Sequence, residues 1–255
     1  ATFVEDPVIV RNPDLSFTMY YAGDAGILRA DSADGLNWTM MSDKPVITKG
    51  AFDSQNLAFW DPTIKKYRCY FRDFRKVRDI KWCVSDDFLN WTEPAFLDYP
   101  DQPLQQLYTN AIRNEPRAPH ILIGFPTRYL PKEGQRVEPT FMSSRDGHTF
   151  HRWLEPVIPE TAPEERTGNR SNYMTWGLLE LPNKPDGYSV YASEAYYTGP
   201  DSRLRRFTYR KDGYVAIVGE KKGSLLTKPF TYQGNELTVN AEIEEGGRLI
   251  VELIT

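Results

Sequence analysis

The sequence predicts an all-β protein built as a β-propeller, and three observations support this prediction. A seven-residue phrase recurs as SADGLNW (32–38), SDDFLNW (85–91) and SRDGHTF (144–150), with a fainter copy in YRKDGYV (209–215). Short runs rich in β-branched and aromatic residues precede each copy, which is typical of strands. No segment of about ten or more residues has a clean helical period.

The strands of the first two units follow the same order. Turn signals such as NPDL and GDA separate the runs. In the first unit the expected strands are VIVRN (8–12), FTMYYA (17–22) and GILRADS (26–32). In the second they are QNLAFWD (55–61), KYRCYFRD (66–73) and DIKWCVSD (79–86), followed after the phrase by WTEPAFL (91–97).

Two further units continue the pattern. The third is expected to contain strands at YTNAIR (108–113), HILIGFPTRY (120–129) and VEPTFMSSR (137–145), and the fourth at MTWGLLELP (174–182), YSVYASEAYY (188–197) and SRLRRFTYR (202–210). Repeats of about 40–60 residues with four antiparallel strands indicate propeller blades around a central channel. A β-sandwich would space its strands similarly, but it would not repeat a turn phrase after every third strand.

The recurring phrase is interpreted as a turn on the rim of each blade. Asp and Ser side chains accept hydrogen bonds from nearby backbone N–H groups, and Gly35 and Gly147 can take a positive φ. The closing Trp or Phe begins the outermost strand. The phrase resembles the Asp-box turn of sialidase-like propellers, Ser-x-Asp-x-Gly-x-x-Trp, although SDDFLNW lacks the glycine. We therefore expect it to be structural rather than catalytic.

The domain organisation follows from where the repeat ends. Residues 1–223 are predicted to form the propeller. Residues 224–255 break the pattern and suggest three further strands with turns at QGN and EGG. This tail either closes the propeller or begins an appended β-sandwich.

Composition excludes several functional classes. The net charge of −4 argues against a nucleic-acid partner, and no apolar run approaches the roughly 20 residues that cross a bilayer. The two cysteines, Cys69 and Cys83, provide no disulfide framework; they either face each other across a hairpin near Lys76 or are buried thiols. The scattered histidines show no metal-ligand spacing, so we predict no metal and no organic cofactor. No loop signature supports a calcium ion in the channel.

Polar residues are predicted to converge at one mouth of the channel. Inner strands begin there and second strands return there, so residues from all four units meet. Inner-strand starts contribute Glu5, Asp6, Asp53, Ser54, Asn56, Tyr108, Asn110, Arg170, Asn172 and Tyr173, and second-strand ends contribute Arg72, Asp73, Arg128 and Glu194. Buried charges are costly without partners, which favours a functional role for the set.

Paired carboxylates are the groups that glycoside hydrolysis needs, one protonated and one ionised. Asp6 and Asp53 are the expected ionised partners. Glu194 is the first candidate for the acid and Glu138 the second. Each has a structural alternative: Asp6 as a turn former before Pro7, Asp53 as a cap of the turn into its strand, and Glu194 in an ion-pair network with Arg170 or Arg205.

The arginines of the mouth also have two interpretations. Arg128 and Arg170 can bind a carboxylate or sulfate on an acidic polysaccharide through forked hydrogen bonds. Alternatively, they neutralise the carboxylates of the channel. Together with Arg72, Asn110, Glu138, Asn172 and Tyr173, they form the predicted substrate-binding set.

In EDPVIVRNPDLSFTMYYAG an Asp-Pro opens an inner strand and an aromatic-rich second strand follows, and FWDPTIKKYRCYFRDF resembles the next such unit. These motifs resemble those of the five-bladed propellers of glycoside hydrolase families 43 and 32. The resemblance covers residues 5 to about 220. It is closest to uncharacterised bacterial, planctomycete-type, family-32-like proteins that carry FDSQNLAFWDP, RAPHILIGFPTRY and NRSNYM.

The resemblance implies a fifth blade in the full protein, a β-sandwich after the propeller and a periplasmic or secreted location. It also implies inner-strand carboxylates as nucleophile or base, a second Asp as orienter and a Glu as acid. Asp6 matches the first Asp-Pro position. Asp61 in WDP falls at the far end of its strand, so it is interpreted as a turn cap. The Glu-Cys motif of the family-32 acid is absent, so the acid is assigned by position.

The sequence therefore predicts a glycoside hydrolase that acts on a poly- or oligosaccharide. The alternatives are a propeller that binds glycans without cleaving them and an interaction scaffold. Hydrolysis requires Asp6, Asp53 and Glu194 to lie within about 5–10 Å of one another in one pocket. Carboxylates locked in salt bridges with no open pocket would argue against it.

Overall fold

The computed structural model describes residues 5–12, 14–100, 102–158, 172–195 and 202–254. Within these ranges the protein contains 18 strands and no helix, so the all-β prediction is confirmed. The strands form four antiparallel sheets. Among the described residues there is also no helix that could span a membrane.

The first two blades are four-stranded sheets in simple up-and-down order. Blade 1 comprises β1 (Glu5–Arg11), β2 (Phe17–Gly23), β3 (Gly26–Ser32) and β4 (Thr39–Met40). Blade 2 comprises β5 (Leu57–Asp61), β6 (Lys66–Arg75), β7 (Val77–Ser85) and β8 (Ala95–Phe96).

The third and fourth blades keep the same plan with interrupted strands. Blade 3 comprises β9 (Gln106–Leu107), β10 (Arg113–Asn114), β11 (Leu122–Gly124), β12 (Thr127–Leu130), β13 (Arg136–Ser144) and β14 (His151–Pro156). Blade 4 comprises β15 (Tyr173–Met174), β16 (Leu179–Leu181), β17 (Lys184–Glu194) and β18 (Arg203–Arg210).

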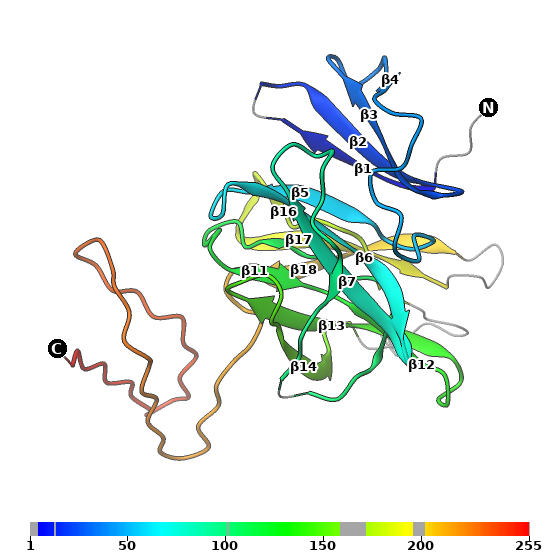
Figure 1. Ribbon diagram of the computed structural model, residues 1–255. Helices are drawn as coiled ribbons and strands as arrows, with labels where there is room; N and C mark the ends of the chain where they lie inside the picture. The colour runs from blue at the N-terminus through cyan, green and yellow to red at the C-terminus, as the bar shows by residue number, and fades with distance from the viewer. Residues whose placement is uncertain (1–4, 13, 101, 159–171, 196–201, 255) are drawn as a thin grey trace.

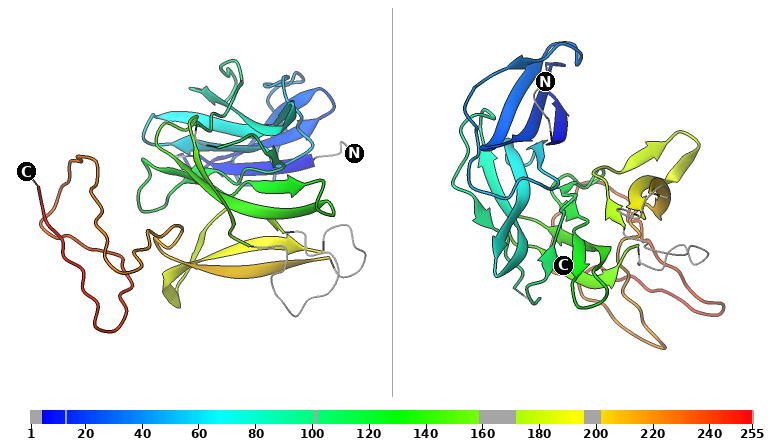
Figure 2. Two further views of the ribbon diagram at one scale, coloured as in Figure 1. Left: turned by 90° about the horizontal axis from the view of Figure 1, so that it is seen from below. Right: turned by 90° about the vertical axis from the view of Figure 1, so that its right-hand side faces the viewer.

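The blades follow one another around an arc in chain order, as the blue, cyan, green and yellow sheets of Figures 1 and 2 show. Neighbouring blades meet where β1 contacts β5, β7 contacts β9 and β13 contacts β15. The core is correspondingly divided into three clusters. The partly buried Trp176 packs against the first two of them.

The structure differs from the predicted strands in blade 3. The expected strand at 108–113 does not form, and only Arg113 of this run lies in a strand, β10. The backbone N–H groups of Asn110 and Ala111 donate to the side chain of Gln55 instead, and Ala111 has a φ of 41°. The hydrogen-bond ladder of a β-sheet cannot continue through residues whose backbone N–H groups donate to a side chain instead.

The recurring turn has the same hydrogen bonds in its three clear copies. In each, the serine hydroxyl lies 3.0 Å from the aspartate Oδ1. That Oδ1 also accepts two backbone N–H groups at 2.8–2.9 Å. The residue after the aspartate has a positive φ: 75° at Gly35, 66° at Phe88 and 82° at Gly147. The missing glycine of the second copy is therefore tolerated, because Phe88 adopts the left-handed conformation.

Each of the second and third turns also receives hydrogen bonds from the blade before it. Tyr20 and Arg29 of blade 1 donate to the carbonyl groups of Phe88 and Asp87. In the same way, Tyr70 donates to the Gly147 carbonyl at 2.8 Å and Arg68 to the Asp146 carbonyl at 2.9 Å. The turn thus joins consecutive blades.

Arg68 also holds the far end of its own blade. Its Nε lies 2.6 Å from Asp61, and both side chains are almost fully buried. Asp61 accepts the Thr63 backbone N–H at 2.9 Å, which confirms its interpretation as a turn cap. On the adjacent pair of strands, Cys69 and Cys83 are cross-strand partners and are free buried thiols.

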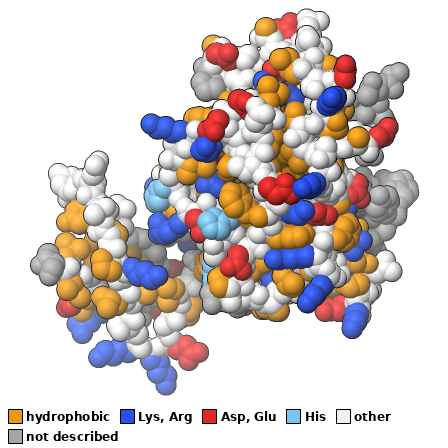
Figure 3. Space-filling view, in the orientation of Figure 1, with side chains coloured by type: hydrophobic (Ala, Val, Ile, Leu, Met, Phe, Trp, Pro, Cys, Tyr) orange, Lys and Arg blue, Asp and Glu red, His pale blue; other side chains and the backbone are white. Residues whose placement is uncertain are grey.

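Beyond blade 4 the chain extends away from the sheets (Figure 1). No residue from 211 to 254 belongs to a strand, including the three strands expected in this tail. Hydrophobic side chains cover much of its surface in Figure 3, and Leu226, Val251 and Ile254 are more than half exposed. The division of the chain at residue 223 stays a prediction.

Gly147→Ala is expected to destabilise the fold more than Gly134→Ala. Both glycines have a positive φ, which costs alanine about 1 kcal/mol. A Cβ at Gly147 would lie 2.2 Å from Arg68 Nη1, whereas one at Gly134 meets nothing within 4 Å. Displacing the buried Arg68 should add about 2 kcal/mol or more. Equal unfolding free energies of the two variants in urea would contradict this account.

Stability should fall in acid because of the turn aspartates. Burial opposes ionisation of Asp146, but hydrogen bonds from the backbone of His148 and Thr149 outweigh it and lower its pKa to about 2. A depressed pKa stabilises the fold above the unfolded value of about 4, and this contribution is lost as the pH falls toward 2. Because Asp146 is exposed, we expect its contribution to the free energy of unfolding to be about 1 kcal/mol. When unfolding in urea is measured at pH 4 and at pH 2, the free energy of unfolding should decrease less in Asp146→Asn than in the wild-type protein.

Candidate functional site

Gln55 joins three blades just before the start of β5, where the sequence predicts the mouth of the channel. Its Oε1 accepts the backbone N–H groups of Asn110 and Ala111 at 3.0 and 2.6 Å, and its Nε2 donates to the Met174 carbonyl at 3.3 Å. Its own carbonyl accepts Asn110 Nδ2 at 3.0 Å. The segment before β5 is thereby held against blades 3 and 4.

Asp53 and Arg72 form an ion pair at this mouth. The Arg72 side chain is 4% exposed, whereas that of Asp53 is 69% exposed. Ser54, next in the chain, donates to the Tyr108 carbonyl at 2.7 Å. The predicted meeting of an inner-strand start with a second-strand end therefore occurs in blade 2.

Aromatic rings from blades 3 and 4 surround these groups. Tyr108 contacts Tyr129 and Tyr173 edge to face, with centroids 5.7 and 5.8 Å apart. The Arg72 guanidinium lies 5.1 Å from the Tyr108 ring centroid. All three tyrosines are half-buried. The rings and the Asp53–Arg72 pair thus form one continuous cluster, the mouth cluster.

A second arginine, Arg78, belongs to the mouth cluster. It lies near the start of β7, where the β6–β7 hairpin extends beyond β5. Its guanidinium lies 4.8 Å from the Tyr108 centroid and 5.4 Å from that of Tyr129. Its backbone N–H donates to Gln106 Oε1 at 3.0 Å.

The turn end of the β6–β7 hairpin is anchored by the buried Asp79. Its carboxylate lies 2.6 Å from Arg75 Nε and accepts Tyr99 OH at 3.2 Å. Burial raises the pKa of Asp79, while the Ile80 N–H and Arg75 oppose the shift. On the same hairpin, Lys81 pairs with Asp73 at 2.6 Å.

Arg128 and Glu138 are cross-strand partners and form a nearly buried ion pair. Their side chains are 12% and 5% exposed. This geometry agrees with the interpretation in which Arg128 neutralises a carboxylate. Glu138, the second candidate for the acid, is accordingly held in an ion pair.

Glu194 ends β17 and is completely buried. Its two oxygens lie 3.0 and 2.8 Å from Nε of Arg203 and Arg205 on the neighbouring strand β18. The network with Arg205 was one of the alternatives for this residue. In this conformation Glu194 presents no exposed atom to a substrate.

The remaining predicted residues occupy different positions. Asn110 and Asn172 are buried, at 1% and 0% exposure, and Asn110 uses its side-chain amide to hold Gln55. Tyr173 belongs to the mouth cluster. The Asp6 side chain and Arg170 lie outside the described residues.

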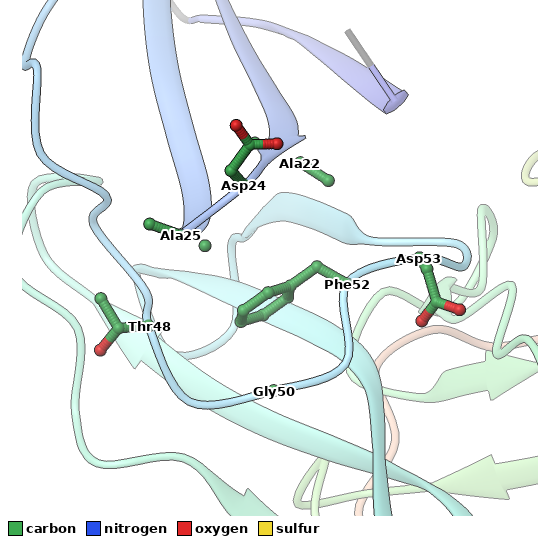
Figure 4. Close-up of a pocket in the computed structure, with 9 residues that line it drawn as sticks. Ala22, Asp24, Ala25, Thr48, Gly50, Phe52 and Asp53 are labelled. Atoms are coloured by element: carbon green, nitrogen blue, oxygen red, sulfur yellow. The ribbon is translucent and has the colours of Figure 1, made fainter. Parts of the chain in front are cut away.

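A pocket of about 420 Å³ opens beside Asp53 (Figure 4). It lies between the β2–β3 turn of blade 1 and the segment that leads to β5. Phe52 extends into this space, whereas Asp53 points toward the neighbouring blades. The pocket is lined by Ala22, Gly23, Asp24, Ala25, Gly26, Thr48, Gly50, Phe52 and Asp53. Asp53 thus belongs to both the pocket and the mouth cluster.

The structure brings Asp53, Arg72 and Tyr173 into one cluster and adds residues that the sequence reasoning missed. Gln55, Arg78 and Tyr129 were not among the residues predicted at the mouth. Tyr108 was predicted there as a residue at an inner-strand start, although it was not included in the substrate-binding set. Arg78 had no such signal, because its strand was expected to begin at residue 79. Among the described residues, no group of three or more His, Cys, Asp or Glu side chains is arranged to hold a metal ion.

Comparison with known proteins supports the fold. No family model matches the chain, and no curated protein sequence does. Among solved structures, it is similar to the β-1,2-mannobiose phosphorylase from Listeria innocua (14% identity, TM-score 0.60, 82% of this chain and 58% of that one). It is also similar to an endo-arabinase from Bacteroides thetaiotaomicron (12%, 0.58, 82% and 76%). A third similar structure is that of a thermostable family-43 glycoside hydrolase, with 12% identity and a TM-score of 0.58 over 82% of this chain and 69% of that one.

These similarities show a β-propeller fold of the kind found in glycoside hydrolases and phosphorylases. The chain spans little more than half of the phosphorylase and about three quarters of the arabinase. The closer likeness to family-32-like proteins remains a prediction.

Glu194→Gln should lower stability more than Asp53→Asn. Glu194 is buried between two arginines, so removing its charge leaves both with one partner fewer; we expect a loss of about 2 kcal/mol, moderated by the partial exposure of the arginines. Asp53 is mostly exposed, and its substitution should cost less than about 1 kcal/mol. Urea unfolding of both variants measures the difference. A Glu194→Gln protein as stable as wild type would show that this carboxylate is not a structural element.

Proposed function

We propose that this protein is a glycan-active enzyme that cleaves glycosidic bonds at the mouth of its propeller. The observation that carries the proposal is Asp53, an exposed carboxylate that borders an open pocket and lies within a cluster of tyrosines and arginines. Flat aromatic faces and forked donors suit a sugar ring with its hydroxyl groups.

The similar solved structures support the same substrate class. They include an endo-arabinase and a mannobiose phosphorylase bound to β-1,2-mannobiose. Fold likeness alone does not transfer an activity, so the argument rests on the site. Glycoside cleavage requires one carboxylate to stay ionised and another acid to protonate the leaving oxygen.

In the proposed mechanism Asp53, together with Asp6, is the ionised partner, with Arg72 orienting Asp53 through their ion pair. Glu194 is the proposed acid. For this role it must become accessible, which requires Arg203 and Arg205 to release it. The mechanism therefore includes a movement at the ends of β17 and β18.

A propeller that binds glycans without cleaving them is the second candidate. It is favoured by the ion pairs of both candidate acids, Glu194 and Glu138. The two candidates differ in one observable: an enzyme releases product, whereas a binding module retains intact oligosaccharide. If the protein bound no glycan, the remaining alternative would be a propeller that serves as an interaction scaffold.

Asp53→Asn should abolish turnover while leaving the fold intact. Wild-type protein is incubated with a panel of plant and algal polysaccharides, with and without inorganic phosphate, and new sugar ends are measured. On any cleaved substrate, Asp53→Asn should lose at least about 100-fold in kcat, because the neutral amide of asparagine cannot take the place of the ionised carboxylate in the reaction.

Asp86→Asn is the matched control, since Asp86 is exposed on an outer turn of the same blade. It should cleave at the wild-type rate. Wild-type turnover by Asp53→Asn would remove Asp53 from the mechanism, and binding without product from any substrate would select the non-catalytic alternative. A requirement for phosphate would identify phosphorolysis instead of hydrolysis.

A further inference from the structure

Arg78 differs from the other two arginines of the mouth in its charge partners. Arg72 pairs with Asp53 and Arg128 with Glu138. Arg78 forms no ion pair with any carboxylate in the part of the chain that the structure describes. Its Nη1 makes only a long hydrogen bond, 3.4 Å, to the neutral Gln106 Oε1. Among the described residues, this half-buried guanidinium therefore has no carboxylate partner.

The surroundings of Arg78 partly compensate for the missing anion. Its guanidinium lies 4.8 Å from the ring centroid of Tyr108, 5.4 Å from that of Tyr129 and 5.6 Å from that of Phe74. Aromatic faces attract a cation, but more weakly than a carboxylate in hydrogen-bond contact does. The rings also hold the guanidinium in place, so little side-chain freedom is lost on binding an anion.

The two carboxylates nearest to Arg78 on its hairpin have other partners. Asp79, next in the chain, is completely buried and is held by Arg75. Asp73, its cross-strand partner, is neutralised by Lys81. Among the described residues, the Arg78 charge therefore remains available to a ligand at the mouth cluster. Tyr108, which contacts Arg78, also contacts Arg72, and Arg72 pairs with Asp53.

We propose that Arg78 makes the mouth cluster selective for glycans that carry an anionic group, a carboxylate or a sulfate ester. The inference rests on the proposed glycan site and adds its substrate class. The guanidinium fork binds two oxygens of either group, and Tyr108 and Tyr129 contact the sugar ring beside it. No neutral oligosaccharide supplies the missing counter-charge.

Binding is measured by isothermal titration calorimetry with three purified probes: oligogalacturonate, which carries carboxylates; an ι-carrageenan oligosaccharide, which carries sulfates; and a neutral β-1,4-galactan oligosaccharide. Wild-type protein should bind at least one anionic probe about tenfold or more tightly than the neutral one, and this preference should weaken with added salt. The two anionic arms distinguish carboxylate from sulfate recognition.

Arg78→Gln should remove the preference for the anionic probe, and Arg78→Lys should retain part of it, because lysine keeps the charge but loses the fork. Arg145→Gln is the control, since it removes the same charge from an exposed position on the outer turn of blade 3. It should bind like wild type. If Arg78→Gln does not fold, Arg78→Lys decides the comparison.

The outcomes separate the two proposals. Equal affinity of wild-type protein for neutral and anionic probes, or equal losses in Arg78→Gln and Arg145→Gln, would overturn the role of Arg78 and leave the glycan site standing. Binding of none of the three probes would overturn both. Loss of the anionic preference in Arg78→Gln with unchanged neutral binding supports the proposal.

Discussion

The arrangement of consecutive blades depends on the carbonyl groups of the Ser-x-Asp turns. Inside each turn, the serine and aspartate side chains accept hydrogen bonds from the backbone N–H groups. In the second and third turns the carbonyl groups are bonded to other side chains. Tyr20 and Arg29, and then Tyr70 and Arg68, reach these carbonyls from the preceding blade. Because Arg68 is also bound to the buried Asp61, the turn of one blade is coupled to the strand end of another.

The mouth cluster is built on this frame but is positioned by a different group. Gln55 uses both ends of its side-chain amide to connect blades 2, 3 and 4. It also accepts the backbone N–H groups of Asn110 and Ala111, which lie within the strand expected at 108–113. Tyr108, at the start of the same segment, packs with its ring against Arg72 and Arg78 and forms the aromatic centre of the site.

The distribution of charge at the mouth explains which residues are open to a ligand. Glu138 and Glu194 are buried and ion-paired, whereas Asp53 is exposed and Arg78 has no described carboxylate partner. Among the described residues of the mouth cluster, a ligand therefore meets the exposed carboxylate of Asp53 and the guanidinium of Arg78. That combination suits chemistry at one end of a sugar and recognition at the other.

The sequence by itself determined the all-β class, the number of visible blades and the turn between the third and fourth strands. These features follow from local chemistry: period-2 strands, turn residues, and Ser and Asp side chains that bond their own backbone. It also placed Asp53 and Arg72 at one mouth, since antiparallel strands return to the same edge. Only the tertiary structure decided which charges are paired, because that depends on side chains meeting across blades. Glu194 between two arginines, Gln55 across three blades and Arg78 among three rings are contacts that no local pattern records.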